Sequence, residues 1–205
     1  MASPALTPSR PMAGVDTTVD LAAWAAHYDQ LHVDLGTGDG RFAVQLARTR
    51  PELGAIGIDT CLDHPHGSPR RHPPNVRFAR LDARDVSIGE EVRAKSVSIN
   101  FPYGSLLRGL VEGDPALADR IDQLLAPDAR LSIRVNERAL LDALLDPGGA
   151  ERAIVRGLHG LGGLTVSVRP ITQAELRAFP STWSKRLGFG RPTAAFLIEA
   201  VRHST

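Results

Sequence analysis

Cysteine and long apolar runs are scarce in this chain of 205 residues. A single cysteine, Cys61, excludes an internal disulfide and a thiolate metal centre, so we expect a reducing cytoplasm. The longest apolar runs, such as residues 194–198, fall far short of the roughly 20 residues that a membrane helix needs. Residues 1–18 lack an apolar region behind a basic start, so we interpret them as a loose arm or short hairpin and not as a secretory signal.

The chain also lacks a strong charge imbalance. Its formal net charge of +1 neither predicts nor excludes a nucleic-acid partner. With 42% hydrophobic and 23% charged residues, the chain suits one domain, which we expect over residues 19–205. We expect a monomer without a membrane partner.

Apolar patterning predicts an α/β fold. Residues 31–36 and 54–59 resemble short buried strands, and residues 41–50 between them resemble a helix that Pro51 ends. Further strands are expected at 76–80, 96–101 and 131–135, with helices at 115–125 and 137–145. Such alternation predicts a mostly parallel sheet covered by helices on both faces. Residues 164–168 and 194–201 lack a full crossover helix between them, so a terminal antiparallel pair is expected.

A glycine-rich turn follows the first predicted strand. Gly36, Gly38 and Gly40 precede the first helix, where backbone must approach a nucleotide-like ligand closely. In the dinucleotide fingerprint the third glycine follows the second by three residues, but here Arg41 occupies that position. Asp59 ends the second strand, where an acid can accept both ribose hydroxyls. The alternative is a purely structural corner.

Two later segments complete the predicted cleft. Asp82 and Ala83 follow the third strand, where the class I methyltransferases that the glycine turn resembles commonly contact an adenine ring, although Asp82 could equally cap a turn. Asn100 opens an Asn-x-Pro-aromatic run that ends at Tyr103 and resembles the tetrapeptide of enzymes that methylate exocyclic amines.

Near the C-terminus, Trp183 stands among Lys185, Arg186 and Arg191, a mixture that suits base stacking and phosphate contact. If Tyr103 and Trp183 face each other, they could clamp a flipped base, with stacking of about 1–3 kcal/mol per ring. The alternative is a core tryptophan.

Residues 64–84 form a local basic stretch. They hold five arginines and three histidines against one acid, which suits phosphate contact or an ordinary solvated loop. A metal cluster of Cys61 with these histidines is disfavoured, because four prolines interrupt the spacing.

The run Asp-x-Gly-x-Gly-x-Gly from Asp34 resembles the first motif of class I methyltransferases, which bind S-adenosylmethionine. Together, VDLGTGDGRF, GIDT, FPYGSLLRGL and STWSKRLGFGR resemble the aminoglycoside-resistance methyltransferases that modify N1 of the decoding-site adenine, nucleotide 1408, of 16S ribosomal RNA in the 30S subunit. This family has tryptophan at the position of Tyr103, glutamate at that of Arg84, and a longer basic linker after Asp59.

The resemblance implies a class I Rossmann-like fold with a seven-stranded, mostly parallel sheet and an antiparallel last strand. Together with the residue patterns described above, the resemblance gives three groups of candidate site residues. Candidates at the target base are Pro102, Tyr103, Ser105, Ser181 and Trp183. Candidates for the cofactor are Asp34, Gly36, Thr37, Gly38, Asp59, Thr60, Asp82, Ala83 and Asn100. Candidates for RNA are Arg70, Arg71, Lys185, Arg186 and Arg191.

Chemistry at N1 needs little from the protein beyond positioning. Neutral adenine carries a lone pair at N1, so attack on a sulfonium methyl group requires no prior general base. We expect backbone carbonyls near Pro102 and the aromatic faces to stabilise the resulting positive charge. Two alternatives stay open: amine methylation of another RNA or small molecule, and a weakly active or non-catalytic relative.

Overall fold

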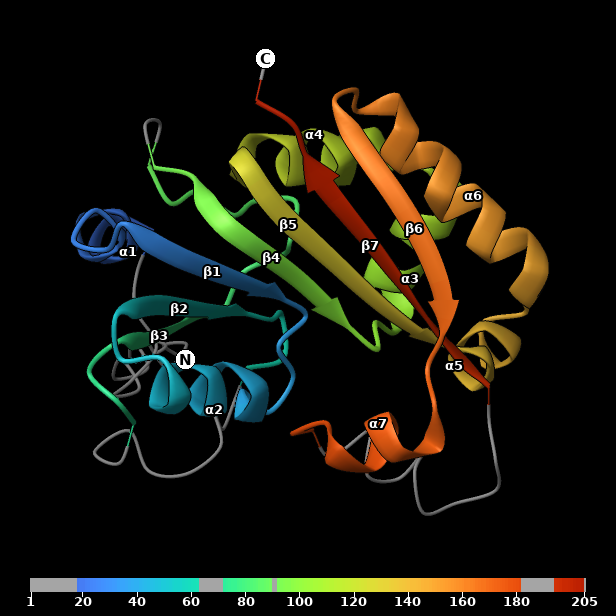
Figure 1. The fold of residues 1–205 in the computed structure, drawn as a ribbon, viewed down its shortest axis with the longest axis horizontal. Helices are drawn as coiled ribbons and strands as arrows, with labels where there is room; N and C mark the ends of the chain where they lie inside the picture. The colour runs from blue at the N-terminus through green and yellow to red at the C-terminus, as the bar shows by residue number, and fades with distance from the viewer. Residues whose placement is uncertain (1–17, 63–71, 90–91, 182–193, 205) are drawn as a thin grey trace, which may run out of the picture.

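One sheet organises the computed structural model, which describes residues 18–62, 72–89, 92–181 and 194–204. Within those ranges the sheet has seven strands in the order β3-β2-β1-β4-β5-β7-β6 (Figure 1). The first five strands in this order form four parallel pairs, whereas β7 runs antiparallel to both β5 and β6. The strands are β1 Gln30–Leu35, β2 Leu53–Ile58, β3 Val76–Ala79, β4 Ala94–Asn100, β5 Leu125–Asn136, β6 Leu164–Pro170 and β7 Ala195–Arg202. The predicted mostly parallel sheet with a terminal antiparallel pair is confirmed.

Helices cover both faces of this sheet. They are α1 Thr18–Ala25, α2 Arg41–Thr49, α3 Gly104–Glu112, α4 Pro115–Leu124, α5 Glu137–Asp142, α6 Pro147–Gly160 and α7 Gln173–Ala178. In Figure 1, α3, α4 and α6 lie behind the strands, whereas α2 and α7 lie along the lower side of the view. The predicted helices correspond to α2, α4 and α5, whereas sequence patterning does not predict α1, α3, α6 or α7. None of the helices in the described ranges is long and apolar enough to cross a membrane.

Local capping signals explain several helix starts. Asp114 precedes α4 and accepts two backbone N–H groups of the first turn, and Pro115 occupies the first turn, where no N–H partner is needed. Asp146 caps α6 by accepting the backbone N–H of Gly149, and Pro147 follows it in the first turn. Thr172 and Glu175 form a reciprocal capping box at α7. These caps explain why α4, α6 and α7 begin at these residues.

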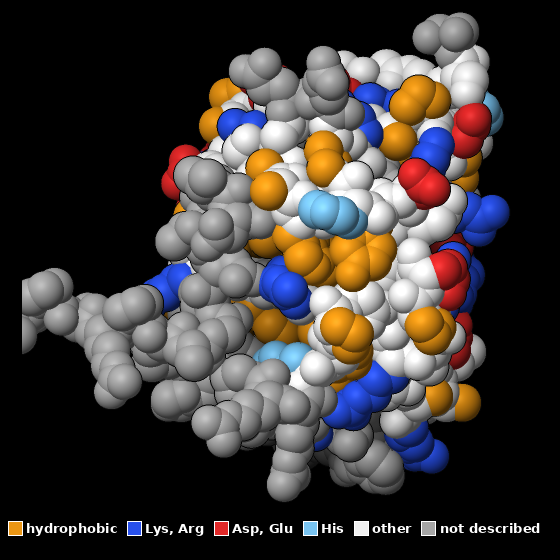
Figure 2. Space-filling model, turned by 90° about the vertical axis from the view of Figure 1, so that its left-hand side faces the viewer, with side chains coloured by type: hydrophobic (Ala, Val, Ile, Leu, Met, Phe, Trp, Pro, Cys, Tyr) orange, Lys and Arg blue, Asp and Glu red, His pale blue; other side chains and the backbone are white. Residues whose placement is uncertain are grey.

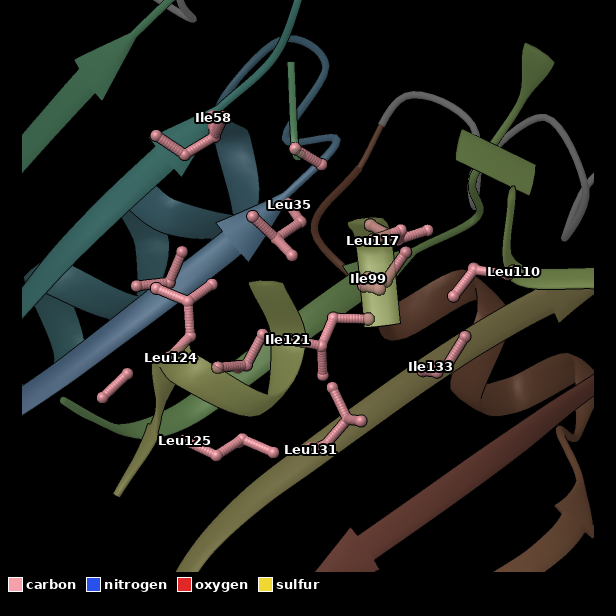
Figure 3. Packing of buried hydrophobic residues seen from close by; sticks show 14 of the residues in the cluster. Leu35, Ile58, Ile99, Leu110, Leu117, Ile121, Leu124, Leu125, Leu131 and Ile133 are labelled. Carbon is pink, nitrogen blue, oxygen red and sulfur yellow. The ribbon is translucent and has the colours of Figure 1, made fainter. Parts of the chain in front are cut away.

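The main core lies between the sheet and the helices behind it. Leu35, Ile58 and Ile99 of the strands meet Leu117 and Ile121 of α4, all at most 2% exposed (Figure 3). Each such side chain contributes about 1.5–3 kcal/mol by burial. A second cluster packs α2 against β2 and β3, and a third forms around Leu176 of α7.

The opposite face of the central strands is polar. Side chains alternate along a strand, so Val33 and Leu35 enter the main core while Asp34 of β1 faces away from it. In the register of the sheet, Asp34 lies beside Ser98 of β4, and Asn100 lies beside Arg134 of β5. These polar residues form the floor on which the candidate site is built.

Candidate cofactor and target site

A cavity of about 680 Å³ lies at the carboxyl ends of β1 to β4. In parallel sheets, ligands bind at this edge, where the strand order reverses, and small-molecule pockets measure roughly 300–1,000 Å³. The cavity is lined by Asp34, Gly36, Thr37, Gly38, Asp39, Phe42, Ile58, Asp59, Thr60, Cys61, Leu81, Asp82, Ala83, Arg84, Asn100, Phe101, Pro102, Tyr103, Gly104, Ser105, Leu106, Phe179 and Ser181. All nine proposed cofactor residues therefore meet in one place, together with Pro102, Tyr103, Ser105 and Ser181.

The glycine turn adopts left-handed backbone geometry. Gly36, Gly38 and Gly40 have φ values of 73°, 58° and 72°, a region that residues with a Cβ atom rarely enter. A Cβ atom at Gly40 would lie 2.6 Å from the Phe78 ring, so that glycine is also needed for packing. At Gly38 a Cβ atom would meet nothing within 4 Å, which leaves backbone open to the cavity.

Asp34 is a fully buried carboxyl group at the base of this turn. Its Oδ1 accepts hydrogen bonds from Ser98 Oγ at 2.6 Å and Asn100 Nδ2 at 2.9 Å, and its Oδ2 accepts one from Thr37 Oγ1 at 2.7 Å. Burial raises the pKa of Asp34 to about 6, against the opposing effect of these hydrogen bonds. On the other side of Ser98, burial lowers the pKa of His32 to about 3.

Asp59 holds the tip of the glycine turn. Its Oδ2 accepts the Gly38 N–H at 2.8 Å, and its Oδ1 accepts the Cys61 N–H at 2.8 Å. A carboxylate has about four acceptor positions, so each oxygen can still accept a hydroxyl. This arrangement suits the predicted contact with two ribose hydroxyls.

Asp82, the candidate for the adenine contact, both caps a turn and lines the cavity. Its Oδ1 accepts the Arg84 N–H at 2.9 Å, which is the predicted turn cap, and yet the side chain also lines the cavity. Ala83 lines the cavity beside it with 7% of its surface exposed. Arg84 forms ion pairs with Asp82 at 3.0 Å and Asp114 at 2.7 Å.

The target side begins with strained backbone. Phe101 is buried with φ of 54°, which is unusual for a bulky residue and occurs most often at functional sites. Its N–H donates to Arg134 O at 2.8 Å. The turn leaves Pro102 buried and Tyr103 57% exposed at the cavity rim, directly before α3. Tyr103 is thus placed where a ring could meet an incoming base.

The amide of Asn100 has a defined orientation. Its Nδ2 donates to Asp34, and its Oδ1 accepts from Arg134 Nη1 at 2.9 Å. In this orientation the carbonyl oxygen is already engaged by a cation. The arrangement differs from the one expected of an enzyme that uses this oxygen to accept a hydrogen bond from a target amine.

An aromatic wall was not anticipated from the sequence. Phe42 and Phe179 stack with ring centroids 5.1 Å apart, and Phe101 meets Phe179 edge-on at 5.6 Å. Arg134 lies over the Phe179 ring, 4.8 Å from its centroid. The three rings come from three distant segments, so no local pattern could reveal them. They close the side of the cavity that faces α7.

Several candidates lie outside the described residues. These are Trp183, Arg70, Arg71, Lys185, Arg186 and Arg191. The expected arm at residues 1–18 also lies outside them, except that α1 begins at Thr18.

The described part of the basic stretch has structural partners. Arg77 lies over Trp24, 5.0 Å from the ring centroid, and donates to two backbone carbonyls. Arg80 donates to Thr60 O at 3.1 Å. Figure 2 views the molecule from the left-hand side of Figure 1. On this face basic, histidine and hydrophobic side chains are mixed, and the acidic ones lie towards the margins. Among the described residues no group of three His, Cys, Asp or Glu side chains could hold a metal ion.

The sheet order, with a cavity at the β1–β4 switch point, is that of the class I Rossmann-like methyltransferase fold. The family model NpmA, described as 16S rRNA (adenine(1408)-N(1))-methyltransferase, matches residues 13–202. The chain therefore belongs to this family, and the resemblance predicted from the motifs is confirmed. It is an enzyme of the methyltransferase class, with S-adenosylmethionine as cofactor.

Individual relatives agree with this placement. The 16S rRNA (adenine(1408)-N(1))-methyltransferase of Escherichia coli is 26% identical over 90% of this chain and 93% of its own length. The solved enzyme of that name from Catenulisporales acidiphilia is 25% identical, with a TM-score of 0.70 over 94% of this chain and 98% of that one. A variant of it was solved with its cosubstrate SAM, at 24% identity and a TM-score of 0.72, over 94% of this chain and 96% of that one. The aminoglycoside resistance methyltransferase NpmB1 is 25% identical, with a TM-score of 0.64 over 91% and 93% of the two chains.

Proposed function

We propose that this protein transfers a methyl group from S-adenosylmethionine to N1 of adenine 1408 of 16S rRNA within the 30S subunit. The observation that carries the proposal is that the glycine turn, Asp59, Asp82, Asn100 and Tyr103 line one and the same cavity. The residues fit the cofactor, because the cavity offers an open backbone turn, an acid for the ribose and a small residue beside the adenine position.

Binding of the cofactor is assigned to residues at the ends of the four strands β1 to β4. Gly36, Thr37 and Gly38 would wrap the amino-acid end, Asp34 would lie near its positive charge, and Asp59 would accept the ribose hydroxyls. Thr60, Asp82, Ala83 and Asn100 complete this set. When bound, the cofactor supplies an electrophilic methyl group on a sulfonium.

Target chemistry would rest on positioning. N1 carries a lone pair, so no side chain has to remove a proton before the transfer. Tyr103 would stack on the adenine ring, and the Pro102 carbonyl would face the developing positive charge. Ser105 and Ser181 would contact the base edges, and Trp183 would supply the second ring of the clamp.

The orientation of Asn100 favours N1 over an exocyclic amine. An amine target needs acceptors for its hydrogens, and the Asn100 oxygen is hydrogen-bonded to Arg134 at 2.9 Å. Releasing it would leave the guanidinium, which is itself partly buried, with one hydrogen bond fewer, at a cost of about 1–3 kcal/mol. A lone-pair nucleophile makes no such demand.

Partners follow from this substrate. Arg70, Arg71, Lys185, Arg186 and Arg191 are proposed to contact rRNA phosphates, and the enzyme is proposed to act as a monomer in the cytoplasm, where 30S subunits are found. We propose one catalytic domain at residues 19–205 behind an arm at 1–18. Methylation of the decoding site would confer aminoglycoside resistance, as the name of NpmB1 states for that relative.

The test combines purified protein, labelled S-adenosylmethionine and 30S subunits, followed by primer extension. A stop at adenine 1408 is expected, because N1 methylation blocks reverse transcription. Label without a stop would instead indicate an amine product. Cofactor binding without label would indicate a non-catalytic relative, and naked 16S rRNA in a parallel reaction tests the need for the assembled subunit.

A further inference from the structure

Arg84 joins three segments at one end of the cavity. Its Nε donates to Asp114 Oδ2 at 2.7 Å, its Nη1 to Asp82 Oδ1 at 3.0 Å, and its Nη2 to the Ser105 carbonyl at 3.4 Å. These acceptors lie after β3, before α4 and at the start of α3. The Arg84 side chain is 25% exposed, so the guanidinium is held from three directions in a partly dry environment.

The carboxylate of Asp82 is held asymmetrically as a result. Its Oδ1 accepts both the backbone N–H of Arg84 at 2.9 Å and the Nη1 group. Within the described ranges no hydrogen bond reaches its Oδ2. Because Asp82 lines the cavity, it can offer one fixed and unused acceptor oxygen to a bound ligand.

We propose that Arg84 is a positioning residue that orients Asp82 so that its Oδ2 accepts a hydrogen bond from the exocyclic amine of the cofactor's adenine. The inference rests on the cofactor assignment made under the proposed function and adds the residue that sets adenine specificity. Asp114 and Asp82 raise the pKa of Arg84 above its ordinary value, so the guanidinium stays charged and keeps both ion pairs. Arg84 also lines the cavity, but in this role it acts through Asp82.

The experiment measures adenine discrimination by calorimetry. The two probes are S-adenosylhomocysteine and S-inosylhomocysteine, which carries a carbonyl in place of the amine. The unmodified protein should prefer the adenine probe by about tenfold or more, as a hydrogen bond to a charged group commonly gives. Arg84→Ala should bring this ratio close to one, mainly by weakening the adenine probe.

Further variants separate positioning from folding. Arg84→Lys should restore part of the ratio, because an ammonium cannot hold two carboxylates as a fork. Asp114→Asn retains a residue suited to capping α4 but removes the charge opposite Nε, so it should lower the ratio partly. Arg120→Ala is the matched control: within the described part of the chain the Arg120 side chain donates hydrogen bonds to the Arg84 carbonyl and to Gln123 but none to Asp82, so the variant should leave the ratio unchanged.

Each contrary result has a distinct meaning. If Arg84→Ala weakens the binding of both probes equally, Arg84 has only a structural role and the inference is overturned. Tighter binding of either probe would mean that Arg84 obstructs the pocket, with the same consequence. If the unmodified protein binds both probes equally, the inference fails while the cofactor assignment stands; if it binds neither, the cofactor assignment fails and takes the inference with it.

Discussion

Replacing Asp34 by asparagine should change how stability depends on pH. Asp34 is fully buried, and the three hydrogen bonds described above all come from neutral groups, so burial raises its pKa from 3.8 to about 6. Between these pH values the folded protein keeps a proton that the unfolded chain has lost. This contribution to stability is fully present below about pH 3.8 and is lost as the pH rises through about 6.

The magnitude follows from the two pKa values. A difference from 3.8 to about 6, at about 1.36 kcal/mol per pH unit, corresponds to about 3 kcal/mol. Asparagine has no such titration. The free energy of unfolding of Asp34→Asn, relative to the unmodified protein, should therefore rise by up to about 3 kcal/mol between pH 4 and pH 7.5.

The assay is urea unfolding of both cofactor-free proteins across this pH range. His32 acts in the opposite direction, because burial lowers its folded pKa to about 3 and stability then rises with pH up to about 6.5. Since His32 is present in both proteins, its effect cancels in the difference. A difference that stays constant from pH 4 to 7.5 would refute the reasoning, because Asp34 would then titrate like an exposed carboxyl group.

Three further predictions concern ligand binding and turnover. Trp183→Ala should abolish methylation of 30S subunits while calorimetry still detects cofactor binding; comparable loss of both would count against the clamp. Tyr103→Ala should lower the methylation rate by roughly tenfold or more, consistent with a stacking contribution of about 1–3 kcal/mol, and Tyr103→Trp should at least maintain it. Asp59→Ala should weaken cofactor binding by roughly tenfold or more in calorimetry, because it removes both the ribose acceptor and the Gly38 hydrogen bond; unchanged affinity would exclude that role.

Sequence patterning predicts the sheet better than the helices behind it. The strands β1 and β2 are short apolar runs with clear ends, so their positions follow from composition. By contrast, α6 begins Pro-Gly-Gly and contains two later glycines, which have low helix propensity. It is stabilised by tertiary packing of Ala150, Ile154 and Leu158, which are four residues apart. Similarly, α3 contains two glycines, which lower its predicted helix propensity, and it directly follows the Asn-x-Pro-aromatic run.

The candidate site divides in the same way. Asp34, Asp59, Asp82 and Asn100 each lie within three residues of the carboxyl end of a strand, and parallel strands bring such positions together, so their meeting could be predicted. The wall of Phe42, Phe101 and Phe179 could not, because its members come from segments far apart in the chain. The sequence also does not predict which further hydrogen bonds these polar side chains form. One example is the bond from Arg134 that fixes the orientation of the Asn100 amide.

Two departures from the family pattern affect different steps of the proposed reaction. Arg84 stands in place of a glutamate, but Asp82, Asp114 and the Ser105 carbonyl accept all of its side-chain hydrogen bonds described above, so the cavity stays intact on the cofactor side. Tyr103 stands in place of a tryptophan at the rim, where 57% of it is exposed and a smaller ring offers less stacking area. A reduced efficiency relative to the family should therefore appear in binding and turnover of the RNA, and cofactor affinity should be affected less.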